Sequence, residues 1–273
     1  MSTPNPSPEP NFEFNPISGS APNVTEPHNE EPEMSLGLRF VNLFVAPSEV
    51  FEYLAKSPAN PLNWALPLLL NCIVIVAFTM FAFSIPAVMQ EAREAQSRQL
   101  DKLVADGKIT AEQRTQQVQA MEKFSTFVPL FGSLAGAVVM VMFAFVVGAL
   151  VWLVSNKALG AATEFSKAME ISGLAGLVSV PGTVVKLALV MLRGSLNVGL
   201  NPGLLFPDIP VGSPLSTALA GIDFFILWTV VLLAAGTGKI TRRGFSAALP
   251  WFAGIWFGFT ALAVGWSALT YSK

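Results

Sequence analysis

Cysteine and histidine are almost absent from this chain of 273 residues, which contains one of each. The single Cys72 cannot form an intramolecular disulfide or a cysteine metal cluster. It lies in an apolar run, where a cysteine is usually a small packing residue. The single His28 cannot supply the two histidines of a zinc protease motif, and it lies far from any apolar segment. The zinc-dependent and Ser–His-dependent intramembrane hydrolases are therefore not expected.

Other signs of catalysis are also missing. The chain has no Gly-x-x-x-x-Gly-Lys phosphate loop. An aspartyl protease dyad needs two acids at membrane depth, and Asp223 is the only acidic residue that we place inside an apolar segment. We therefore expect a protein that is not an enzyme and that uses no cofactor and no metal.

Charge is scarce as well. Charged residues make up 12% of the chain and hydrophobic residues 52%, with a mean hydropathy of +0.56. Soluble globular proteins have about 25% charged residues, so this composition indicates a membrane protein. The N-terminus shows neither the basic region nor the apolar run of a cleavable signal peptide. No basic patch favours nucleic-acid binding.

The first 34 residues form a separate compositional class. They hold six Glu and no Lys or Arg, which gives −6 there and, from a total of −2, leaves +4 for the rest. Residues 1–34 are also rich in Pro, Asn and Ser, so they cannot bury enough apolar surface to fold, and we predict a disordered acidic tail. The following segment, 35–57, contains short apolar helices that either lie at the membrane interface or pack under the bundle.

The remaining sequence, within a membrane domain over 35–273, predicts an all-α, polytopic helix bundle with five transmembrane helices. A span needs about 20 apolar residues. The expected spans are 61–89, 127–155, 169–192, 215–237 and 245–266. Between the first two, residues 90–123 carry six basic and six acidic residues, a turn at Asp106-Gly107 and a capping box of Thr110 with Gln113. This pattern predicts an extramembrane helical hairpin.

Breaks and close contacts are expected within this bundle. Pro181 should kink the third span, because proline removes a backbone hydrogen bond. The segment 193–214 is apolar but dense in Gly and Pro, so we expect it at the interface. Small residues four apart allow helices to approach closely and to self-associate or bind other membrane proteins. Such pairs are Gly132 with Gly136, Ala144 with Gly148, and Gly254 with Gly258.

The distribution of Lys and Arg predicts the orientation. With five spans the termini lie on opposite sides, and the short loops on the N-terminal side carry seven basic residues against two on the other side. Because short cytoplasmic loops are enriched in Lys and Arg, we expect a cytoplasmic N-terminus. The charge-balanced hairpin lies on the opposite side in this topology.

Two ionisable residues are predicted inside the bilayer. Asp223 lies in the fourth span and Lys186 in the third, at similar depths from the side opposite the N-terminus. The depths favour a candidate intramembrane ion pair that fixes helix register. A proton relay is the alternative, since an ionisable residue in a span is a functional candidate by default.

Several short motifs, in order along the chain, are similar to a known family. They are Leu43-Phe44-x-x-Pro47-Ser48-Glu49-x-Phe51, Phe165-Ser166-Lys167-Ala168, Asn201-Pro202-Gly203-Leu204-Leu205, and Ile222-Asp223-Phe224-Phe225-x-x-Trp228-x-x-x-Leu232 followed by Gly236. Together they resemble the Yip domain family of five-span membrane proteins, over about 39–266. The eukaryotic members bind Rab-type GTPases and act in vesicle trafficking and membrane shaping.

The resemblance implies a helix bundle without an established enzymatic activity. The chain lacks the Asp-Leu-Tyr-Gly-Pro motif of the eukaryotic members, having Leu43-Phe44-Val45-Ala46-Pro47 instead, and its charged hairpin resembles the prokaryotic branch. GTPase binding is therefore not carried over, and we expect the plasma (inner) membrane of a prokaryote. The leading hypothesis is a membrane scaffold or membrane-organising protein in contact with the lipid bilayer. The alternative is a small transporter or channel that uses Asp223, and a lipid-modifying enzyme is a third hypothesis without a motif.

Overall fold

The computed structural model of the protein describes residues 2, 34–124 and 127–271, without the side chains of 121 and 122. Contacts divide the chain into Met1–Glu33 and Met34–Lys273, and all the elements below belong to the second unit. The predicted disordered tail at 1–34 falls almost entirely outside the described residues. Within the described residues the chain is helical and contains no strand.

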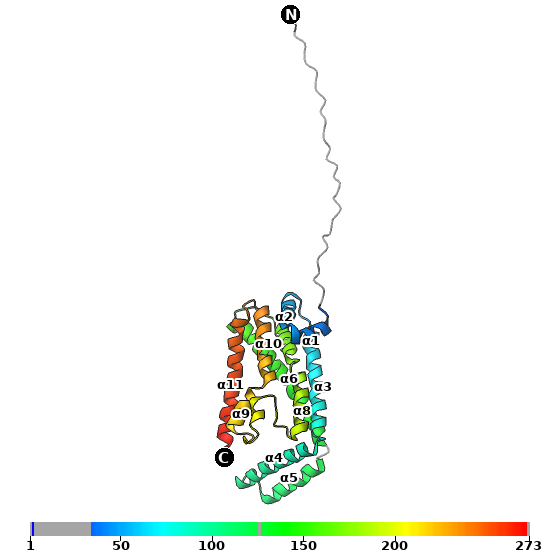
Figure 1. The fold of residues 1–273 in the computed structure, drawn as a ribbon, viewed down its shortest axis with the longest axis vertical. Coiled ribbons are helices and arrows are strands. Elements are labelled where there is room, and N and C mark those ends of the chain that lie inside the picture. The colour runs from blue at the N-terminus through cyan, green and yellow to red at the C-terminus, as the bar shows by residue number, and fades with distance from the viewer. Residues whose placement is uncertain (1, 3–33, 125–126, 272–273) are drawn as a thin grey trace. The chain divides into compact units, whose positions relative to one another are not determined.

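Four helical segments are long and apolar enough to cross a membrane. They are α3 (Leu62–Ala82), α6 (Val128–Leu153) with the π-helical turn η2 (Val154–Ala158), α7 (Phe165–Gly176) with α8 (Ser179–Arg193), and α11 (Phe245–Tyr271). A fifth span is broken into α9 (Pro214–Gly221) and α10 (Phe224–Ile240), which meet at 47°. These helices form the predicted polytopic bundle (Figure 1).

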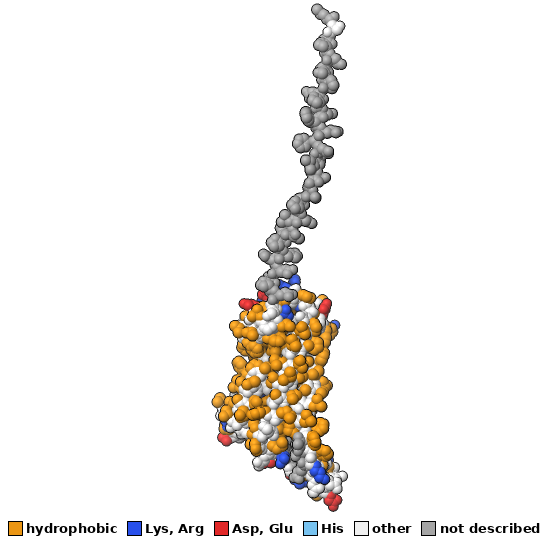
Figure 2. Space-filling view, turned by 90° about the vertical axis from the view of Figure 1, so that its right-hand side faces the viewer, with side chains coloured by type: hydrophobic (Ala, Val, Ile, Leu, Met, Phe, Trp, Pro, Cys, Tyr) orange, Lys and Arg blue, Asp and Glu red, His pale blue; other side chains and the backbone are white. Residues whose placement is uncertain are grey.

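The outer surface of the bundle is hydrophobic. Large apolar side chains stay exposed along the spans, among them Ile73 at 57%, Val139 at 63% and Leu262 at 72%. Figure 2 shows this apolar surface over the middle of the molecule, with charged side chains gathered towards its two ends. In lipid such exposure costs nothing, so the surface is that of an integral membrane protein.

The sequence left two placements open for the short helices in 35–57, either at the membrane interface or packed under the bundle. In α2 (Pro47–Lys56), Val50, Phe51 and Leu54 are fully buried, so this helix packs against the end of the bundle. In α1 (Leu36–Val45), Leu43 is buried but Val45 is 80% exposed. One apolar face of α1 therefore remains available to the membrane interface.

The main hydrophobic core lies at the end of the bundle that carries α1 and α2. Its members include Leu43, Val50, Phe51, Leu54, Val151, Ile171, Leu174, Leu232 and Phe252. We call this region the packed end. A smaller cluster of Ala82, Val88 and Val190 lies at the other end, beside the hairpin, which we call the open end. Most buried apolar side chains therefore lie at one end of the bundle.

The extramembrane hairpin consists of α4 (Pro86–Ala105) and α5 (Ala111–Phe124). The first span ends at Ala82 rather than at 89, because Pro86 starts α4 after a bend. The capping box is present: the Thr110 N–H donates to Gln113 Oε1 at 2.9 Å, and the Gln113 N–H donates to Thr110 Oγ1 at 3.1 Å. Gly107 has a φ of +68° in the turn, which glycine adopts without strain.

The fourth span differs from the continuous helix expected over 215–237. The backbone leaves the helix at Ile222 and Asp223, and α10 starts at Phe224. Two groups from other parts of the chain satisfy the broken backbone. The Phe224 N–H donates to Leu200 O at 3.1 Å, and Trp256 Nε1 donates to Gly221 O at 3.0 Å. Because a backbone group without a partner is costly in a membrane, these contacts make the break possible.

The third span also breaks, at Leu177 and Val178 between α7 and α8. Pro181 follows four residues after Leu177 and has no N–H to donate to that carbonyl. The interruption on the N-terminal side of Pro181 thus agrees with the expected proline effect.

Candidate functional site

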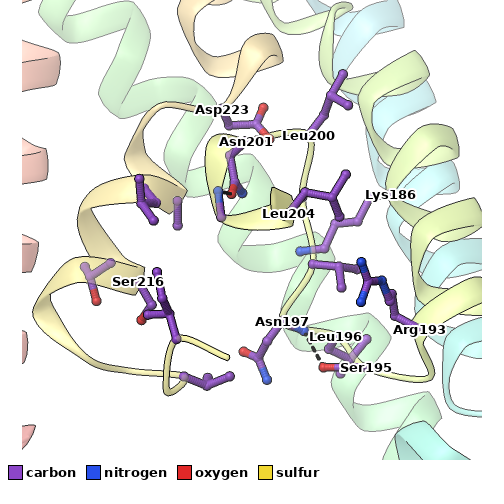
Figure 3. A pocket seen from close by; sticks show the side chains of 18 of the residues that line it. Lys186, Arg193, Ser195, Leu196, Asn197, Leu200, Asn201, Leu204, Ser216 and Asp223 are labelled. Carbon is purple, nitrogen blue, oxygen red and sulfur yellow. Dashed lines mark hydrogen bonds between the residues drawn. The ribbon is translucent and has the colours of Figure 1, made fainter. Parts of the chain in front are cut away.

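A cavity of about 830 Å³ opens between α8, α9, the start of α10 and the segment 194–213. The segment that we expected at the interface forms one wall, including the short 3₁₀ helix η3 (Pro202–Leu205). Figure 3 shows Lys186 and Arg193 on the α8 side, with Asp223 and Asn201 on the far wall. The cavity therefore collects most of the polar residues that the sequence singled out.

The α8 wall is a polar stripe on an otherwise apolar helix. Ser179, Thr183, Lys186 and Arg193 all line the cavity, and spacings of three, four and seven residues place them on one helix face. Ser179 Oγ donates to Gly176 O at 2.6 Å, and Thr183 Oγ1 donates to Ser179 O at 2.8 Å. The hydroxyl groups of this stripe are thus satisfied within the protein.

The two cations of the stripe differ from the hydroxyl groups. Among the residues that the structure describes, neither Lys186 nor Arg193 forms a salt bridge or a side-chain hydrogen bond, and both side chains are exposed. Lys186 lies about 10 Å from the end of α8 at 1.5 Å per residue, within a span. An ionisable group at that depth normally faces a polar cavity or a partner, and here it faces the cavity.

Asp223 is the N-cap residue of α10. Its Oδ1 accepts from the Phe225 N–H at 2.9 Å and from the Ile226 N–H at 3.4 Å. A helix start has N–H groups without partners and a partial positive charge, and a carboxylate offsets both. The acid in this span is therefore explained locally by the break in the helix.

The predicted ion pair between Lys186 and Asp223 can now be placed. Both residues line the same cavity, on opposite walls (Figure 3). No salt bridge joins them within the part of the chain that the structure describes.

The rest of the far wall is built by a family-like motif. Asn201 caps η3, since its Oδ1 accepts from the Gly203 N–H at 2.9 Å, and Pro202 occupies the first position of that turn. A Cβ at Gly203 would lie 2.8 Å from Asn201 Oδ1, so a larger residue there would displace the capping side chain. Phe225 packs against Gly182 of α8 and closes the cavity on the side of the core.

The other family-like residues lie at the packed end. Pro47 starts α2, and Phe51 is fully buried against Gly236 of α10. A Cβ at Gly236 would be 2.7 Å from Ile171 Cγ2 and 2.8 Å from Phe51 Cε1, so the three elements meet too closely for a side chain. Trp228 packs at the edge of the same core. The motifs therefore mark two places, one that holds the bundle together and one that shapes the cavity.

A buried polar network at the packed end was missed from the sequence. Glu170 on α7 is fully buried, although it lies at the very start of the expected third span, 169–192, and was not singled out from the sequence. Its Oε1 accepts from the Asn60 N–H at 2.6 Å and from Asn63 Nδ2 at 2.7 Å, and Lys167 Nζ lies 2.8 Å from its Oε2. A hydropathy profile does not reveal that Glu170 is buried, because burial depends on hydrogen-bond partners that are distant in the sequence.

The network continues to α1. Arg39 Nη1 donates to Asn63 Oδ1 at 2.8 Å, and Arg39 Nη2 donates to Tyr53 Oη at 3.0 Å. The guanidinium carbon also lies 4.6 Å from the centre of the Tyr53 ring. One chain of hydrogen bonds thus connects α1, α2, α3 and α7 at the packed end.

A second missed contact fixes the rim of the cavity to the hairpin. Glu91 on α4 accepts from Ser195 Oγ at 2.7 Å, the Leu196 N–H at 3.0 Å and Asn197 Nδ2 at 2.9 Å. Burial acts to raise the pKa of Glu91, but these hydrogen bonds and the nearby Arg98 outweigh it and hold the pKa below its ordinary value. The hairpin and the cavity wall are therefore joined by a carboxylate.

No metal site is evident in the described part of the chain, where no three His, Cys, Asp or Glu side chains come together. Cys72 is a free cysteine whose Sγ lies 4.0 Å from Ala137 O, between α3 and α6.

Comparison with known proteins gives two similarities. The Yip1 domain model matches residues 41–269 of this chain. A relative, the membrane protein YknW of Bacillus subtilis (strain 168), is 28% identical over 204 residues, which cover 74% of this chain and 79% of the relative. No solved structure matches the chain. The matched residues include both the packed end and the cavity.

Proposed function

This chain belongs to the Yip1 domain family, and from that premise we propose that it is a non-enzymatic, membrane-organising protein that holds an amphiphile of the bilayer in its cavity. The observation that carries the proposal is the contrast between the two ends of the bundle. A hydrophobic core and a polar network hold the packed end together, whereas the open end contains a partly open cavity of about 830 Å³ lined by both apolar and charged side chains. A mixed lining of this kind suits a molecule with an apolar body and a polar head.

Scaffolding of other membrane proteins is the second part of the proposal, and α11 offers the surface for it. A Cβ added at Gly254, Gly258 or Gly265 would meet nothing within 4 Å, so these glycines face away from the bundle. By contrast, Gly132 and Gly136 approach α3, and Gly148 approaches Met169 of α7. The outward glycines leave a groove in which a helix of another copy or of another membrane protein can pack.

The positions of the basic residues support the proposed orientation. Lys239 binds Glu52 of α2 at 3.1 Å, and Arg243 Nε donates to Leu159 O, after η2, at 3.1 Å. These contacts bring the basic connections of three spans to the packed end. By the positive-inside rule, this arrangement supports a cytoplasmic packed end and a cavity in the opposite half of the bilayer. The membrane that we propose is the plasma membrane of a prokaryote.

Transport through Asp223 is not part of this proposal. Its carboxylate accepts two backbone N–H groups at the start of α10, which gives the residue a use without ion movement.

Native mass spectrometry of the full-length protein released from membranes tests the amphiphile. We expect one lipid to stay bound to the wild type and to be lost when Ala220→Trp fills the cavity. The control is Ala135→Trp, which adds the same volume to an exposed position on α6. Retention of the lipid by Ala220→Trp, or its absence from the wild type, would contradict the proposal.

Self-association is tested separately through α11. Gly258→Leu should reduce the dimer fraction in mild detergent, measured by light scattering, because it fills the outward groove. Gly37→Leu, at another glycine with open space around it, is the control. An unchanged dimer fraction, or a wild type that is monomeric at all concentrations, rules out self-association through this face.

A further inference from the structure

We propose that the cavity recognises the phosphodiester group of an anionic phospholipid, held between Lys186 and Arg193. This inference rests on the proposed binding of an amphiphile and names the chemistry of its polar head. It is carried by two cations that face the cavity without a partner in the described residues.

The first argument is the free-energy cost of a cation that lies within a span and has no counter-ion. Lys186 lies within a span, two turns from the end of α8, and an uncompensated charge at such depth is expensive. Other charged groups in this protein illustrate the usual solution, since Lys167 is paired with Glu170 at 2.8 Å. Lys186 and Arg193 have no such partner, so an anion that enters the cavity recovers the missing interaction.

The second argument is geometry. Residues seven apart lie on the same helix face, about 10 Å apart along the axis. Figure 3 shows both side chains directed from α8 into the cavity. Their long apolar stems allow the two heads to approach one anion, and arginine can bind two phosphate oxygens at once. One phosphate group can thus contact both residues.

The third argument is the balance of charge. Two cations and one anion line the cavity, Lys186 and Arg193 against Asp223, which leaves one net positive charge. A phosphodiester carries one negative charge and neutralises the site. Several neutral donors at the rim are already used, since Ser195 and Asn197 donate to Glu91. Recognition of an anion therefore falls on the two free cations.

The remaining lining explains why the anion should belong to a lipid. The charged pair shares the cavity with apolar lining residues: Leu196, Leu204, Phe206, Ile209, Leu219 and Ile226. A basic pocket between membrane helices is a common way to bind an anionic headgroup. Inorganic phosphate shares the charge, but it leaves this apolar wall without a partner.

The experiment uses full-length protein, stripped of lipid in a neutral detergent, and measures thermal stability during titration with three probes. Dioleoylphosphatidylglycerol carries the phosphodiester, dioleoylglycerol is a lipid without phosphate, and inorganic phosphate is the free anion. The test variant is Lys186→Gln with Arg193→Gln. The matched control, Lys157→Gln with Arg242→Gln, removes two exposed charges at the packed end.

We expect phosphatidylglycerol to raise the melting temperature of the wild type and of the control, and to bind the test variant at least about tenfold more weakly, as for loss of one or more charge-assisted contacts. If dioleoylglycerol binds as well as phosphatidylglycerol, phosphate recognition is wrong but the cavity still takes an amphiphile. If neither lipid binds, the proposed function fails too. Equal stabilisation by inorganic phosphate alone would make this a free-anion site and overturn the lipid assignment.

Two further variants distinguish a loss of lipid binding from a failure to fold. Lys186→Arg keeps the charge and should retain the response to phosphatidylglycerol. Lys186→Met removes an unpaired charge, so the lipid-free protein should be at least as stable as the wild type while its response to lipid falls. A response to lipid that Lys186→Met leaves unchanged would contradict the proposal.

Discussion

Asn63 and Glu170 meet in the interior of the packed end, where Asn63 Nδ2 donates to Glu170 Oε1 at 2.7 Å and both side chains are fully buried. Asn63 also accepts from Arg39, so this contact connects the first membrane helix to α1 and α7 together. Buried polar groups stabilise a fold only when their partners are present. The packed end therefore depends on every member of this network.

Replacement of Glu170 should destabilise the bundle strongly. Glu170→Leu leaves the Asn63 amide and the Asn60 N–H without their acceptor and Lys167, which still donates to Leu54 O at 2.8 Å, without its counter-ion. The loss of one member of a buried pair costs about 3–5 kcal/mol. Thermal unfolding in detergent measures the effect. Glu164→Leu, an exposed acid at the start of the same helix, should change little. Equal melting temperatures for the two variants would show that the network does not stabilise the bundle.

Substitution of Asp223 should act through helix capping. Asp223→Leu removes the acceptor of the Phe225 and Ile226 N–H groups and should cost about 0.5–2 kcal/mol. Asp223→Asn keeps an acceptor oxygen and should lose less. Thermal unfolding compares the two, with Asp208→Leu in the exposed loop as the control. A larger loss in Asp223→Asn than in Asp223→Leu would show that capping is not its role.

Glu91 should make the hairpin sensitive to acid. Burial acts to raise the pKa of Glu91, but the hydrogen bonds from the cavity rim favour the charged form and hold the pKa below its ordinary value. A lowered pKa contributes stability that is complete above about pH 5 and is lost as the pH falls through the folded value. Protease cleavage of the hairpin, followed between pH 7 and pH 3, should rise at the acidic end. Glu91→Gln should flatten the curve, whereas Glu94→Gln should leave it unchanged; identical curves for all three proteins would contradict the role of Glu91.

A double-mutant cycle decides whether Lys186 and Asp223 are coupled. Since no salt bridge joins them in the described residues, the changes Lys186→Met and Asp223→Leu should add to within about 0.3–0.5 kcal/mol in the free energy of unfolding. Recovery of stability in the double variant would reveal the predicted ion pair. The measurement is best made on lipid-free protein, so that a bound anion does not alter the charge balance.

Gly236 and Gly254 provide a test of packing on matched glycines in helices. Gly236→Ala places a Cβ 2.7 Å from Ile171 and 2.8 Å from Phe51, and such overpacking costs about 1–3 kcal/mol. Gly254→Ala meets nothing within 4 Å and should be neutral or slightly stabilising, because alanine favours the helix. Thermal unfolding of both variants checks the difference. Similar losses would mean that α2 does not pack against α10 as closely as described.

The sequence was sufficient for the features that depend on nearby residues. Long apolar runs predicted the helical, polytopic bundle, and Thr110 with Gln113 predicted the cap of the hairpin, because capping involves residues three apart. The effect of Pro181 on the third span was likewise local. Each of these signals lies within one helix or one turn.

The features that depend on distant partners could not be predicted. The break before Phe224 needs Leu200 and Trp256 to satisfy the backbone, and hydropathy gives no sign of either contact. The burial of Glu170 needs Asn60, just before the first span, and Asn63 within that span. The cavity was also invisible, although Lys186 and Asp223, which lie on its walls, were both singled out as unusual.

The unequal distribution of burial has a consequence for how the molecule opens. The core around Phe51, Ile171 and Leu232 lies at one end, while α9 has no fully buried residue and borders the cavity. Local opening follows buried contacts, so backbone amides of α7 should exchange slowly and those of α9 and the 194–213 segment rapidly. The protein should therefore be rigid in one half of the bilayer, around the core, and flexible in the other half, around the cavity.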